Sequence, residues 1–299
     1  MNWFIYAIAA PFLNAIDSLG EKLLVDKHVT DAIVIVFNEG LLFFLFGLSI
    51  LLWHHVIILP FIQTFALLVS GMLFIYYLIP YFKALSDEDA SSVVPLFQFI
   101  PIIVLILSFL FLKEAITVKE LVGFFIIFFG AFTLTSDRID ATLFKPRKSF
   151  WYMLLSSFLY GLAPILFKFV VVNTDFWTAF FYQALGGGIG AATLFLYTPY
   201  RKSFLKENMH LPRRTWLILT CNQTITIAAE LSASFAFSLA PVALVSIITG
   251  TQPAFTLLFA IILTKWFPHI IHEDMSRKTL LTKSISIVGI LAGVIFMYL

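Results

Sequence analysis

Acidic side chains inside apolar stretches are the residues of this chain most able to do chemistry. Glu39 and Glu230 each lie far inside a long apolar segment, and Asp17 lies inside the first one. A charged group at the centre of a membrane helix costs about 2.5 to 3.5 kcal/mol even on insertion scales, so such groups usually serve an ion or substrate pathway. We therefore interpret Glu39 and Glu230 as candidates for proton or cation handling. A neutral acid that hydrogen-bonds a neighbouring helix is the structural alternative.

Amides, hydroxyls and tyrosines accompany these acids. Carboxylates among tyrosines suit a cationic or zwitterionic solute, although each tyrosine alone is also explained by packing. The candidate residues of a central substrate-binding cavity are Asn14, Asp17, Asn38, Glu39, Tyr77, Tyr81, Gln98, Tyr160, Tyr182, Asn222, Thr226, Glu230 and Gln252.

Prolines are the second chemical signal, because each one removes a backbone hydrogen bond and frees a carbonyl inside a helix. We expect the helices to be interrupted at Pro80, Pro95, Pro101, Pro164 and Pro253. Pro101 with Gln98, and Pro253 with Gln252, occupy corresponding places in the two halves of the chain. These two prolines are our candidates for helix kinks that take part in gating.

Signs of catalysis or of a resident cofactor were not found. The sequence has no HExxH, GxSxG or GxxxxGK[ST] motif, and His54-His55 lack a metal-ligand partner at helical spacing. The run Gly186 to Gly190 has no strand before it, so close helix packing explains it better than phosphate binding. We expect no enzyme activity, no cofactor and no metal site.

The amino-acid composition indicates that these segments lie in a lipid bilayer. Of 299 residues 61% are hydrophobic and 12% are charged, whereas soluble domains carry about 25% charged residues. The net charge of +2 offers no basic field for nucleic acid. Cys221 is the only cysteine, so no internal disulfide can form. Residues 1–20 lack the features of a cleaved signal peptide, so we expect the first apolar stretch to remain as a membrane helix.

Ten apolar segments are long enough to span a bilayer, for which about 20 residues suffice. Spans of this kind must be helical, because lipid offers the backbone no hydrogen-bond partners. The predicted fold is an all-α membrane protein with ten transmembrane helices, at approximately Trp3 to Leu24, Ala32 to Trp53, Phe61 to Leu85, Ser92 to Leu112, Val118 to Thr135, Phe150 to Val172, Phe176 to Thr198, Thr215 to Leu239, Val242 to Thr264 and Leu280 to Leu299.

The two halves of the chain resemble each other. The matching residues are Phe12-Leu13 and Phe158-Leu159, Lys22 and Lys168, Asp31 and Asp175, Glu39 and Gln183, Pro101 and Pro253, Lys113 and Lys265, and Gly130 and Gly293. Because each half has five helices, an odd number, the second must enter the membrane from the opposite side. We predict two inverted five-helix repeats, residues 1–138 and 150–299, joined by a basic loop at 139–149, with the substrate site between them.

Charge distribution predicts the orientation. Sixteen of the nineteen Lys and Arg residues fall in the loops after the first, third, fifth, seventh and ninth helices or at the helix ends next to those loops. By the positive-inside rule those loops are cytoplasmic, and both termini face outward. We expect a multi-pass protein of the bacterial inner (plasma) membrane.

One long motif resembles the drug/metabolite transporter superfamily, EamA type. It comprises Val94-Pro95-Leu96, Pro101, Phe111-Leu112-Lys113-Glu114 and Glu120-Leu121-Val122-Gly123 to Gly130-Ala131; the second half departs from it at Lys265-Trp266, and about ten extra residues, His269 to Arg277, precede the last helix. The resemblance implies ten helices in two repeats and a central cavity walled by helices one to four and six to nine. It also implies peripheral fifth and tenth helices, which leaves a homodimer open.

A secondary transporter is the function that these signals favour. We expect a carrier that moves a small polar metabolite, such as an amino acid, amine or nucleotide-type solute, by alternating access around a midplane cavity. Its partners would be that small molecule and the bilayer, with no nucleic acid. A channel and a protein that handles lipid or isoprenoid substrates are the alternatives.

Overall fold

The computed structural model describes residues 2–87, 93–135, 147–266 and 277–298. Within these residues the chain is helical and contains no β-strand, which confirms the predicted all-α class. The predicted connecting loop at 139–149 lies mostly outside the described residues, as do the extra residues that precede the last helix. The helices are α1 (Asn2–Lys27), α2 (Ile33–Ile50), α3 (Phe61–Tyr76), α4 (Leu78–Asp87), η1 (Val94–Gln98), α6 (Phe99–Leu107), η2 (Ser108–Leu112), α7 (Val118–Thr135), α8 (Lys148–Val171), α9 (Phe176–Leu196), α10 (Thr198–Asn208), α11 (Arg213–Leu239), α12 (Val242–Thr249), α13 (Gln252–Trp266) and α14 (Arg277–Tyr298).

Each predicted segment coincides with one helix or with consecutive helices. Six stretches of the described chain are long and apolar enough to cross a membrane: Trp3–Val25, Ile33–Ile50, Phe61–Asp87, Lys148–Val171, Phe176–Leu196 and Val242–Ile262. Leu96–Leu112 and Ser284–Met297 are shorter apolar helices. Helix α10 was not predicted; it is short and none of its residues is buried. The chain is therefore a multi-pass membrane protein, and ten crossings remain a prediction.

Three of the apolar segments are divided within their length. The first breaks at Tyr77 between α3 and α4, and the second consists of η1, α6 and the π-helical turn η2. The third breaks at Gly250-Thr251 between α12 and α13. Pro80, Pro101 and Pro253 each lie in the first turn after a break, where a missing N–H is tolerated.

The interruption predicted at Pro164 is wrong. Helix α8 runs through this residue without a break from Lys148 to Val171. A single missing hydrogen bond is tolerated inside a membrane helix when neighbouring helices pack closely around it. Helix α8 has such neighbours, because it packs against α3, α4 and α6.

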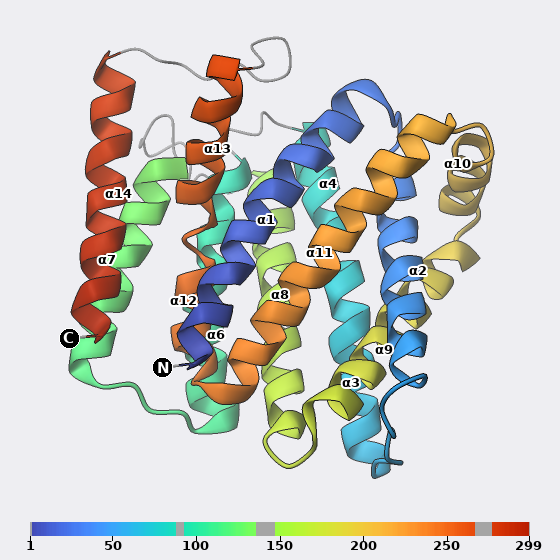
Figure 1. The fold of residues 1–299 in the computed structure, drawn as a ribbon, viewed down its shortest axis with the longest axis horizontal. Coiled ribbons are helices and arrows are strands. Elements are labelled where there is room, and N and C mark those ends of the chain that lie inside the picture. The colour runs from blue at the N-terminus through green and yellow to red at the C-terminus, as the bar shows by residue number, and fades with distance from the viewer. Residues whose placement is uncertain (1, 88–92, 136–146, 267–276, 299) are drawn as a thin grey trace.

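The packing of the helices brings the two halves of the chain together (Figure 1). Helix α1 lies beside α11 and α13, and α8 lies beside α3 and α6. Helices α7 and α14 pack against each other at one edge of the molecule, and both chain ends lie at the same end of the bundle. Each half therefore contributes helices to a shared centre.

Helix α9 approaches α3 through glycines, as the sequence predicted for Gly186. A Cβ atom on Gly186 would lie 2.1 Å from the carbonyl oxygen of Leu68, and one on Gly71 would lie 1.8 Å from that of Gln183. Real Cβ atoms do not come so close to backbone, so only glycine fits. This close contact sets Gln183 of α9 against α3.

Candidate functional site

Four acidic side chains from three helices share the centre of the molecule. Asp17 and Glu21 come from α1, Glu39 from α2 and Glu230 from α11. Glu39 interacts electrostatically with the other three, and Glu21 also interacts with Asp17. The predicted candidates Asp17, Glu39 and Glu230 are therefore brought together, although Glu39 and Glu230 are 191 positions apart in sequence.

Asp17 links α1 to α11. Its Oδ1 accepts a hydrogen bond from Asn222 Nδ2 at 2.7 Å and another from Thr226 Oγ1 at 2.6 Å. Asn222 and Thr226 are four residues apart and so lie on one face of α11. Gly20 permits this approach, because a Cβ there would lie 1.7 Å from Asn222 Oδ1. Asp17 as a residue is 8% exposed, and its carboxyl group thus has two donors from the other half of the chain.

Glu230 belongs to a second polar group, which joins α11 to α9 and α3. Its Oε1 accepts from Gln183 Nε2 and from Ser234 Oγ, both at 3.2 Å. The same Gln183 amide nitrogen lies 3.4 Å from Ser70 Oγ, and Ser70 in turn donates to the carbonyl of Ala163 at 2.8 Å. Every described partner of Glu230 is therefore a neutral donor.

An internal cavity lies beside Glu230. Its volume is about 10 Å³, which is near the minimum of about 10 to 15 Å³ needed for one water molecule. The lining combines polar and aromatic side chains: Phe74, Tyr160, Ala163, Pro164, Phe167, Gln183, Glu230, Ser234 and Phe237. The space beside Glu230 is therefore the size of one small polar group, and Asp17, Glu21 and Glu39 do not line it.

Glu39 has a buried oxygen that is not satisfied. Its side chain is 3% exposed, and its Oε1 has no hydrogen-bond partner among the described residues. The adjacent Asn38 faces elsewhere, because its Nδ2 donates to Val34 O at 2.8 Å and to Asn208 Oδ1 on α10 at 3.1 Å. A buried acceptor without a partner costs about 1 to 3 kcal/mol, so a donor at Glu39 would stabilise the site.

Three of the four candidate tyrosines border the acids. The rings of Tyr77 and Tyr160 are 4.8 Å apart, and both residues interact electrostatically with Glu39. Tyr81 interacts with Glu21 and packs on Phe97 at 4.8 Å. Tyr182 does not join them: its hydroxyl donates to Ile57 O at 3.4 Å, in the connection between α2 and α3.

The repeat-related proline region forms a separate contact. Gln98 Nε2 donates to Gly250 O at 3.4 Å, and a Cβ on Gly250 would lie 3.2 Å from Pro101 Cγ. On the other side of this break, Gln252 Nε2 donates to the carbonyl of Asn14 at 3.2 Å. Among the described residues, the side chain of Asn14 itself makes no hydrogen bond to the acids. The break between α12 and α13, beside Pro253, is thus stabilised by contacts of Gln98, Pro101 and Gln252.

Sequence reasoning missed several members of the centre. Glu21 follows Asp17 by one helical turn, a spacing that places both on one face of α1. Gln183 corresponds to Glu39 in the repeat comparison, which was the signal that it faces the same centre. Ser70 and Ser234 carried no signal, because a single serine in a membrane helix is ordinary.

Polar contacts between the halves flank the centre at both ends of the bundle. At one end Asp31 accepts from Ile33 N at 3.0 Å and from Ser203 Oγ of α10, while Glu207 accepts from Asp31 N at 3.1 Å. At the other end Asp175 accepts from Thr178 N at 3.0 Å and from His54 Nε2 at 2.8 Å. Asp31 and Asp175, which correspond in the comparison of the two halves, therefore have similar partners. Each accepts a hydrogen bond from the first turn of the helix that follows it and another from a residue in the opposite half of the chain.

Glu114 holds the turn between α11 and α12. Its Oε2 accepts from Val242 N at 2.7 Å, at the first residue of α12. Lys168 Nζ donates to the carbonyls of Phe237 and Ala240, at 2.8 and 3.0 Å, at the end of α11. Burial raises the pKa of Glu114 above its ordinary value of 4.5, although Val242 N–H and Lys168 oppose that shift. Both residues satisfy helix ends and so support the scaffold.

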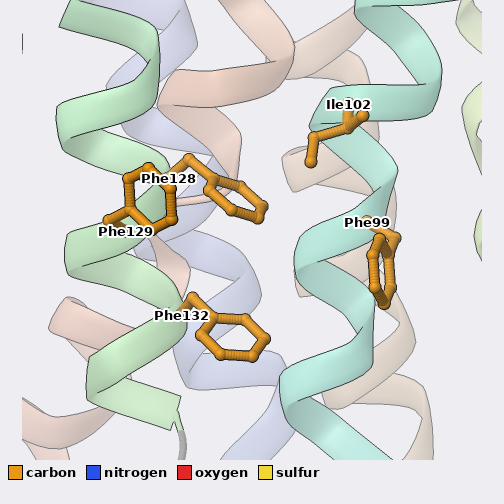
Figure 2. Close-up of a pocket in the computed structure, with 5 residues that line it drawn as sticks. All are labelled: Phe99, Ile102, Phe128, Phe129 and Phe132. Carbon is orange, nitrogen blue, oxygen red and sulfur yellow. The ribbon is translucent and has the colours of Figure 1, made fainter. Parts of the chain in front are cut away.

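A larger apolar groove lies away from the acids, between α6 and α7 (Figure 2). Its volume is about 270 Å³, and it is lined by Phe99, Ile102, Phe128, Phe129 and Phe132. Phe128 and Phe132 reach from α7 toward α6, and Phe129 is 62% exposed. With no polar side chain in its lining, this groove suits hydrocarbon rather than a polar solute.

Comparisons with known proteins agree with this architecture. Residues 1–136 match the EamA-like transporter family. A solved structure described as "Crystal structure of protein" has a TM-score of 0.70 and 12% sequence identity, and the match covers 99% of this chain and 96% of that one. At that identity the likeness concerns the fold alone. No curated protein matches the chain.

Proposed function

We propose that this chain, an EamA-type member of the drug/metabolite transporter superfamily, is a secondary carrier for a small polar metabolite. It would work by alternating access, with its two halves exposing a central site to one side of the membrane at a time. The family is one of membrane transporters. The cargo class and the alternating mechanism are the parts that we infer.

The observation that carries the proposal is that Glu39, from the first half of the chain, and Glu230, from the second half, interact electrostatically at a centre built by both halves. Buried acids are expensive in a membrane, and the described contacts leave Glu39 Oε1 without a donor. A site between two halves is the arrangement that rocking motions can open alternately. Titration of Glu39 and Glu230 could couple transport to protons; uniport and exchange are the other modes open to such a site.

Helix neighbours support an inverted repeat with ten crossings. If the first and sixth predicted helices correspond, the pairs α1 with α11 and α8 with α3 are equivalent, as are α1 with α13 and α8 with α6. All four pairs pack against each other. Such reciprocal neighbours are expected for two copies of one five-helix unit inserted in opposite directions.

We further propose that both termini face outward. They lie at the same end of the bundle, and α10, with Arg201, Lys202 and Lys206, lies toward the other end (Figure 1). The positive-inside rule puts that end in the cytoplasm. In a Cys221→Ser background, a cysteine at Thr174 should react with an impermeant maleimide from outside intact cells and one at Lys202 should not; the reverse pattern would reject this orientation.

The groove between α6 and α7 favours a second candidate function, the handling of lipid-like cargo. Its five apolar side chains and volume of about 270 Å³ suit a hydrocarbon chain. It shares none of its lining residues with the acidic centre, however. A polar-metabolite carrier explains the buried acids, which a lipid site would not require.

A ligand screen tests the proposed function. The purified protein would be tested for thermal stabilisation by amino acids, amines, nucleosides, sugar nucleotides and lipids, because a ligand that binds only the folded state raises Tm. Saturable uptake of a stabilising polar compound into proteoliposomes is the expected result. Stabilisation by lipids alone would favour the second candidate. Single-channel currents in planar bilayers would contradict a carrier of either kind.

A further inference from the structure

We propose that α10 and the start of α11 form a binding surface for the headgroups of anionic phospholipids. This inference goes beyond the carrier function, and it does not depend on the cargo or on which side of the membrane the surface faces. It is carried by exposed cations on α10, by exposed apolar side chains next to them, and by the contacts that fix the opposite face of α10 on α2.

Helix α10 lies at a boundary of the membrane. It begins at Thr198, directly after Phe176–Leu196, a stretch that is long and apolar enough to cross. Its 11 residues extend over about 16 Å, roughly half of the hydrocarbon thickness of about 30 Å. It lies at the edge of the bundle beside α2, level with the first turns of that helix, where it contacts Phe37 and Asn38 (Figure 1). We therefore place α10 among the headgroups and not across the hydrocarbon.

The two faces of α10 differ in character. One face is half-buried, and its residues recur at spacings of three and four, which puts them on one side of the helix. They are Tyr200, Ser203, Phe204, Glu207 and Asn208. The other face exposes Arg201, Lys202, Leu205 and Lys206, and it is followed by Met209, which is 78% exposed. This outer face therefore presents three cations next to apolar side chains.

The protein itself supplies no anion to these three cations among the described residues, where none of them forms a salt bridge. The acid of α10, Glu207, is directed inward and accepts hydrogen bonds from the backbone N–H groups of Thr30 and Asp31. Asp31 in turn accepts from Ser203 Oγ on the inner face of α10. The positive charge of the outer face is thus available to an external anion.

Two further cations extend the surface, because α11 begins with Arg213 and Arg214, both exposed. Exposed apolar side chains lie on either side of α10 in the chain: Leu196 is 76% exposed and Leu217 is 60% exposed. Cations beside exposed apolar side chains are typical of surfaces that bind anionic membranes, where phosphates attract the cations and hydrocarbon covers the apolar groups. A free phosphate ion or an acidic protein segment would explain the cations alone. The exposed leucines therefore favour a lipid.

The inner face of α10 connects this surface to α2. The ring of Phe204 packs on Phe37 at 4.9 Å, and Asn208 Oδ1 accepts from Asn38 Nδ2 at 3.1 Å. Asn38 directly precedes Glu39, the acid that α2 contributes to the centre. A lipid bound to the outer face should therefore hold α10 on α2 and stabilise the folded protein.

Lipids that differ only in the charge of the headgroup test the proposal. The full-length protein in detergent would receive dioleoyl phosphatidylglycerol or dioleoyl phosphatidylcholine at equal, increasing mole fractions, with Tm as the readout. Phosphatidylglycerol should raise Tm saturably and by more than phosphatidylcholine. The difference should shrink as NaCl is raised from about 0.15 M to about 1 M, because the Debye length falls from about 8 Å to about 3 Å. Equal effects of the two lipids would overturn the proposal.

Substitutions test the location of the surface. In the double variant Lys202→Gln/Lys206→Gln, the half-saturating mole fraction of phosphatidylglycerol should rise at least about tenfold, because each basic side chain near an anionic membrane strengthens binding about fivefold. Without lipid its Tm should stay near the wild-type value, since both side chains are exposed. Lys202→Arg/Lys206→Arg keeps both charges and should respond like the wild type. A wild-type response of the Gln variant would overturn the assignment to α10.

A matched control removes the same number of charges from the other end of the bundle. Lys113 and Lys119 are exposed there, next to and within the start of α7 (Figure 1). Lys113→Gln/Lys119→Gln should leave the half-saturating mole fraction of phosphatidylglycerol unchanged. An equal loss of response in this variant and in Lys202→Gln/Lys206→Gln would show that net charge, and not this surface, attracts the lipid.

Soluble anions separate a lipid from other partners. Inorganic phosphate and glycerol 3-phosphate offer the phosphate without hydrocarbon, and polyglutamate offers the charges of an acidic protein. Each would be added at the concentration at which phosphatidylglycerol saturates, and none should raise Tm as much. Equal stabilisation by either phosphate would indicate a site for a soluble anion, and greater stabilisation by polyglutamate would indicate a protein partner; both results would overturn the proposal. Neither result would affect the carrier function, which solute uptake tests.

Discussion

At the scale of single residues, the acids at the centre differ in how completely they are satisfied. Asp17 has two donors from α11, Glu230 has two neutral donors beside a cavity, and Glu39 has a buried oxygen with none. These acids all lie in apolar segments of the sequence, but they differ in how many hydrogen bonds from a ligand they could still accept. Glu39 therefore has more to gain from a hydrogen-bond donor than Asp17 or Glu230 has.

Asp17 should tolerate loss of charge but not loss of its acceptor. Asp17→Asn keeps an oxygen that can accept from Asn222 and Thr226, so Tm should stay near the wild-type value. Asp17→Ala leaves the Asn222 amide without its partner and should cost about 1 to 3 kcal/mol. Thermal unfolding of the detergent-solubilised proteins measures both. Equal Tm values for Asp17→Ala and the wild type would show that the contact between α1 and α11 does not depend on this residue.

Burial cost predicted that Glu39 and Glu230 belong to one central region, and local spacing predicted the surroundings of the tyrosines less well. Glu39 and Glu230 could be found because an acid in a long apolar segment is conspicuous. Tyr182 was predicted by the same depth argument, but helix rotation turns its hydroxyl toward Ile57. Gln183 was left out because an uncharged amide costs less to bury, and its role depends on Ser70 and Glu230, far away in sequence.

At the scale of elements, glycine decides how closely α9 approaches α3. Gly186→Ala would place a Cβ 2.1 Å from Leu68 O, so the helices must separate and Tm should fall by several degrees or the protein should fail to accumulate. Gly289→Ala in α14 is the matched control, because a Cβ there meets nothing within 4 Å. Tm of Gly289→Ala should be unchanged or slightly higher. A normal Tm for Gly186→Ala would mean that α9 and α3 are farther apart than described.

Asp175 ties the start of α9 to the opposite half through His54. Burial tends to raise the pKa of Asp175, but hydrogen bonds from Thr178 and His54 outweigh it and hold this pKa below its ordinary value of 3.8. A lowered folded-state pKa stabilises the protein above about pH 3.8, and this stabilisation is lost as pH falls through the folded-state pKa. The ionised form is therefore the one that stabilises α9.

The corresponding prediction concerns Asp175→Ala. At pH 7 the substitution should cost about 0.5 to 2 kcal/mol, as expected for loss of an N-cap. The difference in Tm from the wild type should shrink as pH is lowered from 5 toward 3. His54→Ala, which leaves the bond from Thr178 N in place, should lower Tm less than Asp175→Ala. A difference in Tm that is independent of pH would contradict the role given to the ionised carboxylate.

At the scale of the whole molecule, hydropathy predicted most of the architecture. The lengths of the apolar segments predicted where the helices lie, because a backbone surrounded by lipid must make its hydrogen bonds within a helix. It did not predict α10, which is short and mainly polar and is held by contacts such as Phe204 with Phe37 and Asn208 with Asn38. It also could not predict which faces meet, since lipid and protein interiors are equally apolar. The resemblance between the two halves of the sequence partly supplied that information, by relating Glu39 to Gln183 and Asp31 to Asp175.

Closure of the centre is a property of the whole assembly. A cavity of about 10 Å³ cannot hold most metabolites, so the alternating access that we propose would require the halves to separate on one side and then on the other. A protein that opens to one side at a time moves a solute back only by reversing its conformation. Such a protein should therefore exchange unlabelled solute inside a vesicle for labelled solute outside it.

Counterflow tests alternating access most directly. Proteoliposomes would be loaded with a high concentration of the compound that gives the largest thermal stabilisation and diluted into a trace of the same compound, radiolabelled. A carrier should accumulate label transiently above its equilibrium level, and Glu39→Gln should reduce that overshoot strongly. Label that only relaxes monotonically to equilibrium, at a rate that does not saturate with concentration, would contradict a carrier and indicate a pore.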